Sequence, residues 1–199
     1  MDAINVIKES FRAFLENLVA YVIGFLVCSV GSLLIVTAPP LEFGAYYMCL
    51  KGARGEKVKI TDIFKGFSFF KVSWMYFLFI LLIGLAPVLL VSIAAGNAIL
   101  SPGVFILYGA VLCWILALVF SQTYAIPAII SKNLEAADGA KASMSLVKEN
   151  LGATILLMIC LVAIGMALSL IPIAGGLISG IITSIATSKM YLELQAKRK

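Results

Sequence analysis

Residues 8–18 read KESFRAFLENL and residues 141–151 read KASMSLVKENL, with Lys, Ser, Glu, Asn and Leu in the same places 133 residues apart. Apolar side chains accompany the match at helical spacing, because positions 4, 7, 11, 14 and 18 correspond to 137, 140, 144, 147 and 151. Each copy therefore predicts an amphipathic helix at the membrane interface that runs into a membrane span ending near a proline. Chance similarity between two stretches rich in the same apolar residues is the alternative.

The composition of the chain indicates a membrane protein. Of its 199 residues, 62% are hydrophobic and only 13% are charged, and the mean hydropathy is +1.10. A soluble domain of this length needs more polar residues to cover its surface. The apolar runs lack strict alternation, which favours helices long enough to cross a hydrocarbon core about 30 Å thick. Such runs lie at 17–38, 67–95, 103–130 and 151–171, with a weaker one at 174–192.

The charges predict which side of the membrane each connection occupies. All 15 Lys and Arg residues fall at 8–12, 51–71, 132–148 and 189–199. The links at 96–103 and 172–176 carry no charge. Because basic segments stay on the cytoplasmic side, the basic clusters are expected inside and the uncharged links outside. This reasoning predicts a hairpin over 67–130 and another over 151–192.

The N-terminal third leaves two topologies open. If residue 1 is cytoplasmic, the chain must cross the membrane twice between Glu16 and Lys51, which requires two short spans and a lysine that reaches back to the interface. If residue 1 is outside, one crossing suffices and the protein has five helices. The repeat favours the first topology, because Pro39 pairs with Pro172 at the same offset and the second copy begins on the cytoplasmic side.

Three stretches resemble one family of membrane proteins. They are PPLEFGAYYMCLKGARGE (39–56), ITDIFKGF (60–67) and YAIPAIISKNLEAADGAKASMSLVKEN (124–150). The chain resembles small six-helix bacterial and archaeal integral membrane proteins of unknown function, related to the membrane domain attached to some glycerophosphodiester phosphodiesterases. The resemblance implies a membrane fold and no catalytic residue. The chain departs from that pattern in its short first hairpin and in Glu42, where a neutral residue is usual.

The residue inventory disfavours an enzyme. Histidine is absent, which removes the commonest general base and a common metal ligand. Four cysteines stand singly in apolar stretches, where they are expected to pack as small residues. No phosphate-binding loop or nucleophile motif is present. We therefore expect no catalytic residue, no metal, no cofactor and, for want of any such motif, no nucleic-acid partner.

Glu42 and Gln122 are the candidate functional residues within the apolar segments. Glu42 is the one charged residue outside the basic segments, and isolated acids within a membrane commonly bind ions or protons. The favoured alternative is that Pro39 and Pro40 begin a helix and that Glu42 lies in its first turn, where a carboxylate stabilises the helix dipole.

A stripe of small residues marks the last apolar segment. Gly176, Gly180, Ser184 and Ser188 recur at every fourth position, beside Gly175, Ser179, Thr183 and Thr187. Small residues at this spacing let helices approach closely in a membrane, so the stripe predicts helix packing. The alternative is a polar face that lines a conduit.

Aromatic and basic residues gather at the start of the third apolar run. Lys65, Lys71 and Trp74 are candidates for contact with lipid headgroups, because aromatic and basic residues concentrate at membrane interfaces. The net charge of +5 fits anionic lipid at the cytoplasmic face.

Together these features predict an all-α, single-domain protein over residues 1–199. We expect a polytopic bundle of six transmembrane helices in three hairpins, with cytoplasmic amphipathic segments and cytoplasmic termini, in the cell membrane. The expected function is non-enzymatic and acts through contact with lipid, with a membrane-protein partner or with further copies of the chain. A small permease or channel is the alternative.

Overall fold

The computed structural model describes residues 3–95, 102–172 and 174–198, and those residues contain helices and no strand. Part of the uncharged link expected outside the membrane, 96–101, falls outside the described residues. The elements in chain order are α1 (Ala3–Glu16), α2 (Leu18–Gly31), the 3-10 helix η1 (Ile35–Thr37), α3 (Ala38–Ala53), the 3-10 helix η2 (Ile60–Phe69), α4 (Phe70–Ala95), α5 (Pro102–Ser121), α6 (Ala125–Lys132), α7 (Ala136–Glu149), α8 (Leu151–Leu168) and α9 (Ala174–Lys197).

The repeated sequence forms the same local structure twice. In each copy an amphipathic helix, α1 or α7, ends one residue before an asparagine, and an apolar helix, α2 or α8, begins after it. Asn17 and Asn150 have similar backbone angles (φ −124° and ψ 26°, φ −128° and ψ 40°). Their side-chain amides donate to the carbonyls of Ala13 and Leu146, at 3.3 and 3.1 Å, so each satisfies an acceptor at the end of the first helix. The predicted helix-to-helix unit is confirmed.

Three helical stretches are long and apolar enough to cross a membrane. They run over Ile60–Ile93, Pro102–Lys132 and Leu151–Leu168. The α1–α2 pair would count as a fourth only if its two helices, bent by 89°, formed one broken span. These stretches match three of the expected apolar runs and are compatible with a membrane location.

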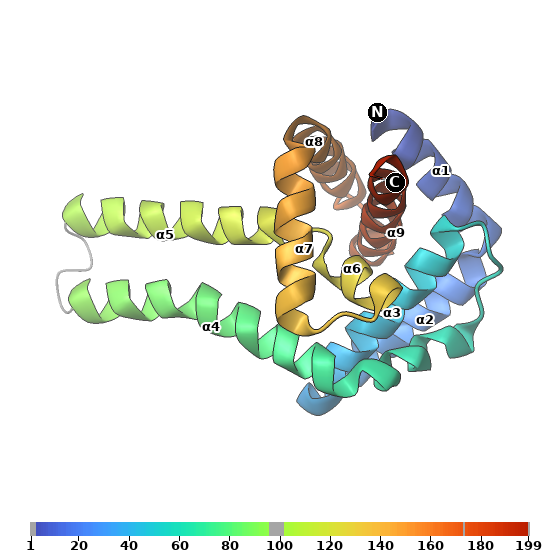
Figure 1. Cartoon of the computed structure of the whole chain (residues 1–199), viewed down its shortest axis with the longest axis horizontal. Helices are drawn as coiled ribbons and strands as arrows, with labels where there is room; N and C mark the ends of the chain where they lie inside the picture. Colours follow the sequence, from blue (N-terminus) through green and yellow to red (C-terminus); the bar gives the residue numbers. More distant parts are fainter. Residues whose placement is uncertain (1–2, 96–101, 173, 199) are drawn as a thin grey trace.

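The arrangement of six helices in three hairpins is not confirmed. The helix α2 has 14 residues, about 21 Å, and so is shorter than the hydrocarbon core. Most residues of α3 are buried within the protein, as are many of α9, and the two helices contact each other. With 16 residues α3 is short for a span, and α9, although 24 residues long, is not among the stretches apolar enough to cross a membrane. Figure 1 shows the α4–α5 hairpin extending away from the other helices, with α8 and α9 seen nearly end-on.

Two glycines bring α3 and η2 into close backbone contact. A Cβ atom at Gly44 would overlap the carbonyl oxygen of Ile63, and one at Gly66 would overlap the carbonyl oxygen of Pro40. The ion pair between Lys51 Nζ and Asp62 Oδ2, at 2.9 Å, joins the same two elements. This contact fixes α3 in the centre of the fold.

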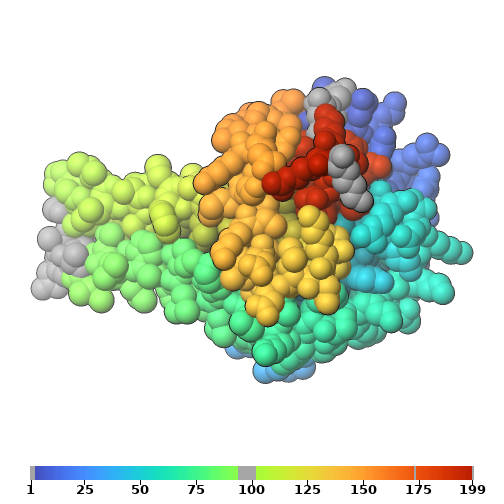
Figure 2. Space-filling view, viewed as in Figure 1, coloured from blue at the N-terminus to red at the C-terminus, as the bar shows by residue number. Residues whose placement is uncertain are grey.

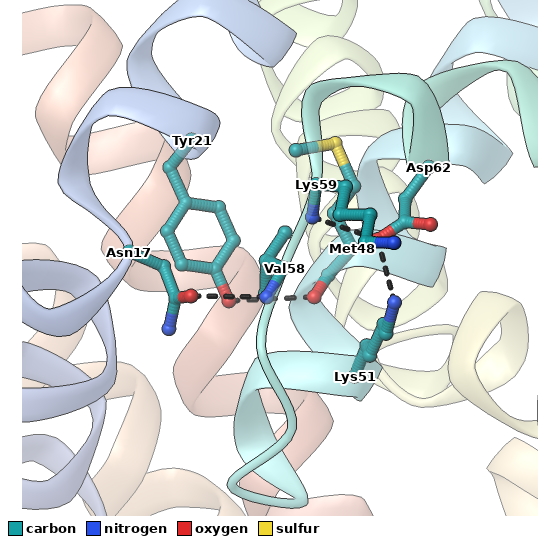
Figure 3. Close-up of polar contacts among 7 residues, drawn as sticks. All are labelled: Asn17, Tyr21, Met48, Lys51, Val58, Lys59 and Asp62. Atoms are coloured by element: carbon teal, nitrogen blue, oxygen red, sulfur yellow. Dashed lines mark hydrogen bonds and ion pairs between the residues drawn. The ribbon is translucent and has the colours of Figure 1, made fainter.

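A cluster of polar contacts holds the loop between α3 and η2 against the first bend (Figure 3). Asn17 Oδ1 accepts a hydrogen bond from the Val58 amide at 3.0 Å, and the Tyr21 hydroxyl donates to the Met48 carbonyl at 3.3 Å. Tyr21 is buried, so its hydroxyl needs this internal acceptor.

The charged ends of three helices meet on one face of the protein. Lys189 of α9 pairs with Glu9 of α1 at 2.6 Å, and Arg198 pairs with Glu149 of α7 at 2.8 Å. The two termini lie near each other in Figure 1. The last basic cluster of the sequence is therefore joined by ion pairs to α1 and to the end of α7.

Candidate functional site: a cavity beside Glu42

The backbone places Glu42 beyond the first turn of its helix. The 3-10 helix η1 leads directly into α3, whose first residue is Ala38, and no acidic residue lies in the first turn of α3. The favourable effect of the helix dipole falls off within that turn. The interpretation of Glu42 as a first-turn carboxylate is therefore wrong.

Glu42 lines a cavity of about 340 Å³ enclosed by six helices and the turn that follows α5. Gln122, the other candidate from the sequence, lines the same cavity from the turn after α5, at the base of the α4–α5 hairpin. The full lining consists of Pro39, Glu42, Phe43, Tyr46, Ser73, Tyr76, Phe77, Ile80, Val119, Gln122, Thr123, Ile126, Met158, Thr183 and Thr187. Two candidates 80 residues apart in sequence thus meet at one site.

Glu42 and Gln122 each carry a hydrogen-bond acceptor that has no partner among the described residues. The Glu42 side chain is exposed at the cavity and forms no ion pair or hydrogen bond with another described residue. The Oε1 atom of Gln122 is buried and accepts no hydrogen bond, whereas its Nε2 atom donates to Ser121 Oγ at 3.3 Å. No Lys or Arg is among the described residues that line the cavity, so the carboxylate has no internal counter-ion there.

Aromatic rings form much of the remaining wall. Phe43 and Tyr76 meet edge to face with ring centroids 6.2 Å apart, and Tyr46 and Phe77 lie beside them in the lining. Aromatic faces attract cations electrostatically, and a carboxylate reinforces that attraction. The cavity therefore combines one negative charge with the faces that favour a positive ligand.

The position of Glu42 along α3 places it far from the polar end of that helix. Lys51 follows Glu42 by nine residues, about 14 Å along a helix axis. The hydrogen bond with Asp62 raises the pKa of Lys51, which stays charged and marks the polar end. A distance of about 14 Å is roughly half of the hydrocarbon thickness.

The small-residue stripe of α9 meets its neighbours only in part. A Cβ atom at Gly176 or Gly180 would have nothing within 4 Å, so the helix packing expected at these two glycines is absent among the described residues. Ser184 and Ser188 are buried. The close contact is at Gly175 instead, where a Cβ atom would overlap the Leu168 carbonyl oxygen.

Residues beside this stripe reach the cavity. Thr183 and Thr187 line it, and Tyr46 of α3 interacts with the side chains of Ser184 and Thr187. The alternative interpretation of the stripe was a polar face that lines a conduit. The residues named for that face include Thr183 and Thr187, which line this cavity. Sequence reasoning missed Tyr46 and Tyr76, because aromatic residues in an apolar run give no sign of the face they occupy.

The candidate headgroup residues lie away from the cavity. Lys65 and Lys71 are exposed, and neither is among its lining residues. Trp74 donates from Nε1 to the Val36 carbonyl at 3.1 Å and meets Phe77 edge to face, so it also holds η1 against α4.

Comparison with family models, curated proteins and solved structures finds no match for this chain. The family resemblance inferred from the three sequence stretches therefore stays a prediction, and the functional argument depends on the geometry of the cavity.

Proposed function

We propose that this chain is a non-enzymatic, multi-pass membrane protein that binds a small organic cation in the cavity beside Glu42. The observation that carries the proposal is the unpartnered carboxylate of Glu42 in an aromatic cavity, which the side chain of Gln122 also lines. A ligand that brings a positive charge would pair with that carboxylate.

The size of the cavity favours an organic cation over a bare metal ion. About 340 Å³ lies near the lower end of the range for small-molecule sites, which is roughly 300–1,000 Å³. A metal ion would need several oxygen ligands converging at about 2–2.6 Å. Among the described residues, no group of three His, Cys, Asp or Glu side chains could hold one.

The energetic cost of Glu42 also supports a binding role. An ionised carboxylate in a low-dielectric region is unfavourable unless it is paired or hydrogen-bonded. Glu42 lacks such a partner among the described residues, and the helix dipole gives it little support. A bound cation would supply the missing partner, as it would in the permease alternative.

We further propose that the basic segments and both termini face the cytoplasm of a cell membrane. The support is the excess of Lys and Arg in those segments and the ion pairs that join α1, α7 and the end of α9 on one face. Contact with lipid or a partner protein is the second candidate function, favoured by the exposed apolar side chains of α4 and α5.

Choline tests the proposal when it is compared with 3,3-dimethylbutanol, which has the same shape without the charge. The protein in detergent is heated with each compound, because a ligand that binds the folded state raises its unfolding temperature. We expect choline to raise it and the neutral alcohol to leave it unchanged. Glu42→Gln should remove the effect, whereas Glu56→Gln, at an exposed position outside the cavity, should retain it.

Equal shifts from choline and the neutral alcohol would contradict a charge-selective site. A choline effect that survives in Glu42→Gln would place the binding elsewhere on the protein.

A further inference from the structure

A second, almost entirely apolar groove lies where α7 crosses the base of the α4–α5 hairpin. Its volume is about 490 Å³, and its walls include Phe79 and Ile83 of α4, Trp114 and Leu118 of α5, and Met144 of α7. The helix α7 contacts both α4 and α5. Figure 2 shows α7, in orange, against the base of the projecting green hairpin.

Two lysines of α7 stand at the rim of this groove. Lys141 and Lys148 are seven residues apart, which is two turns of a helix, so they lie on one face about 10 Å apart along its axis. Lys141 approaches Asp138 at 3.8 Å, but both side chains are largely exposed, and such a pair contributes little. Lys148 has no hydrogen bond or ion pair with another described residue.

A polar recess continues from the groove past the same two lysines. It has a volume of about 360 Å³, and Met144, Ser145 and Glu149 complete its lining. Glu149 forms an ion pair with Arg198 at 2.8 Å, and Arg198 also donates a hydrogen bond to Ser145 Oγ at 3.3 Å. Three positive side chains, those of Lys141, Lys148 and Arg198, lie around the recess, together with the two negative side chains of Asp138 and Glu149. The net charge around the recess is therefore positive.

The orientation of α7 matches a position at a membrane surface. In Figure 1 α7 runs across the axis of the α4–α5 hairpin, whose helices are long and apolar enough to span a bilayer. If the hairpin crosses the membrane, an amphipathic helix that runs across it at its base can lie along the interface. The apolar groove then faces the acyl region and the lysines face the headgroups.

We infer that this groove binds an anionic phospholipid, with an acyl chain between α7 and the hairpin and the phosphate on Lys141 and Lys148. The charge of the rim selects the headgroup, and the apolar walls accept a chain. The groove shares Gln122 with the Glu42 cavity, but neither Lys141 nor Lys148 lines that cavity, so changes at these lysines test the groove alone.

Tryptophan fluorescence reports on this groove directly, because the chain has two tryptophans and only Trp114 lines the groove. In a Trp74→Phe background, the detergent-solubilised full chain is titrated with phosphatidylglycerol or phosphatidylcholine brominated in the acyl chains, which quenches tryptophan on contact. We expect saturable quenching that favours phosphatidylglycerol by about fivefold for each lysine, the usual effect of one basic residue near an anionic surface.

The double variant Lys141→Gln/Lys148→Gln should lose the preference while its Trp114 is still quenched by both lipids. The matched control Lys8→Gln/Lys57→Gln removes two exposed lysines outside the groove and should keep the preference. Equal quenching by both lipids in the parent, no quenching by either, or an equal loss in the control would each overturn the proposal.

Discussion

Asn17 and Asn150 stand at the same place in the two copies of the helical unit, yet their side chains differ in what they hold. Both donate to a carbonyl four residues earlier. Only Asn17 also accepts from a distant backbone amide, that of Val58, 41 residues away. Val58 is buried, so its amide has no ready access to water if Asn17 is removed. Both asparagines thus hydrogen-bond the end of the preceding helix, and Asn17 in addition binds a distant segment of the chain.

We expect Asn17→Ala to destabilise the fold more than Asn150→Ala. Each substitution removes a local bond, but the first also leaves the Val58 amide without an acceptor, at a further cost of about 1–3 kcal/mol. The two variants can be compared by thermal unfolding in one detergent, with Asn150→Ala as the matched control. Equal losses would mean that water or another acceptor serves the Val58 amide.

At the scale of elements, the sequence predicted where helices form better than it predicted which helices contact one another. The repeat correctly predicted two amphipathic helices that each run into an apolar helix after an asparagine. The regular small-residue stripe suggested packing at Gly180, whereas the close backbone contact between α3 and η2 lies at Gly44 and Gly66, which follow no such pattern. Spacing along one helix reveals a face that can pack, but the partner for that face depends on the arrangement of the other helices.

Gly44→Ala should therefore destabilise the protein, because the new methyl group would overlap the backbone of η2, which cannot rotate away as a side chain can. Overpacking of this kind costs about 1–3 kcal/mol. Gly180→Ala adds the same group where nothing lies within 4 Å and should stabilise the helix by roughly 0.5–1 kcal/mol. Thermal unfolding distinguishes the two, and a Gly44→Ala protein as stable as its parent would contradict the close α3–η2 contact.

At the scale of the whole molecule, hydropathy predicted an all-helical membrane protein but could not predict the bundle. The helix α3 is too short and α9 too polar to qualify as a span, and many residues of both are buried within the protein, so three stretches remain as candidate spans. Glu42 and Gln122 could be identified as unusual residues in apolar sequence. Their meeting in one cavity depends on how α3 and the end of α5 pack, which a pattern along the chain does not record.

Charge distribution nevertheless yields a test of orientation for the whole molecule. With the four native cysteines replaced by serine, a cysteine at Lys57 and another at Ala174 are compared for reaction with a membrane-impermeant thiol reagent added to intact cells. Both positions are exposed, so burial within the protein does not protect either one. Because Lys57 lies in the most basic connection and Ala174 in an uncharged one, we expect labelling at Ala174 alone.

Labelling at Lys57 alone would reverse the orientation, and labelling of both would mean that these two connections lie on the same outer side. Either result would mean that Lys141 and Lys148 do not face the cytoplasm, so they could not bind anionic lipid at the inner face of the membrane. The cation cavity would not be affected, because the choline experiment tests it independently.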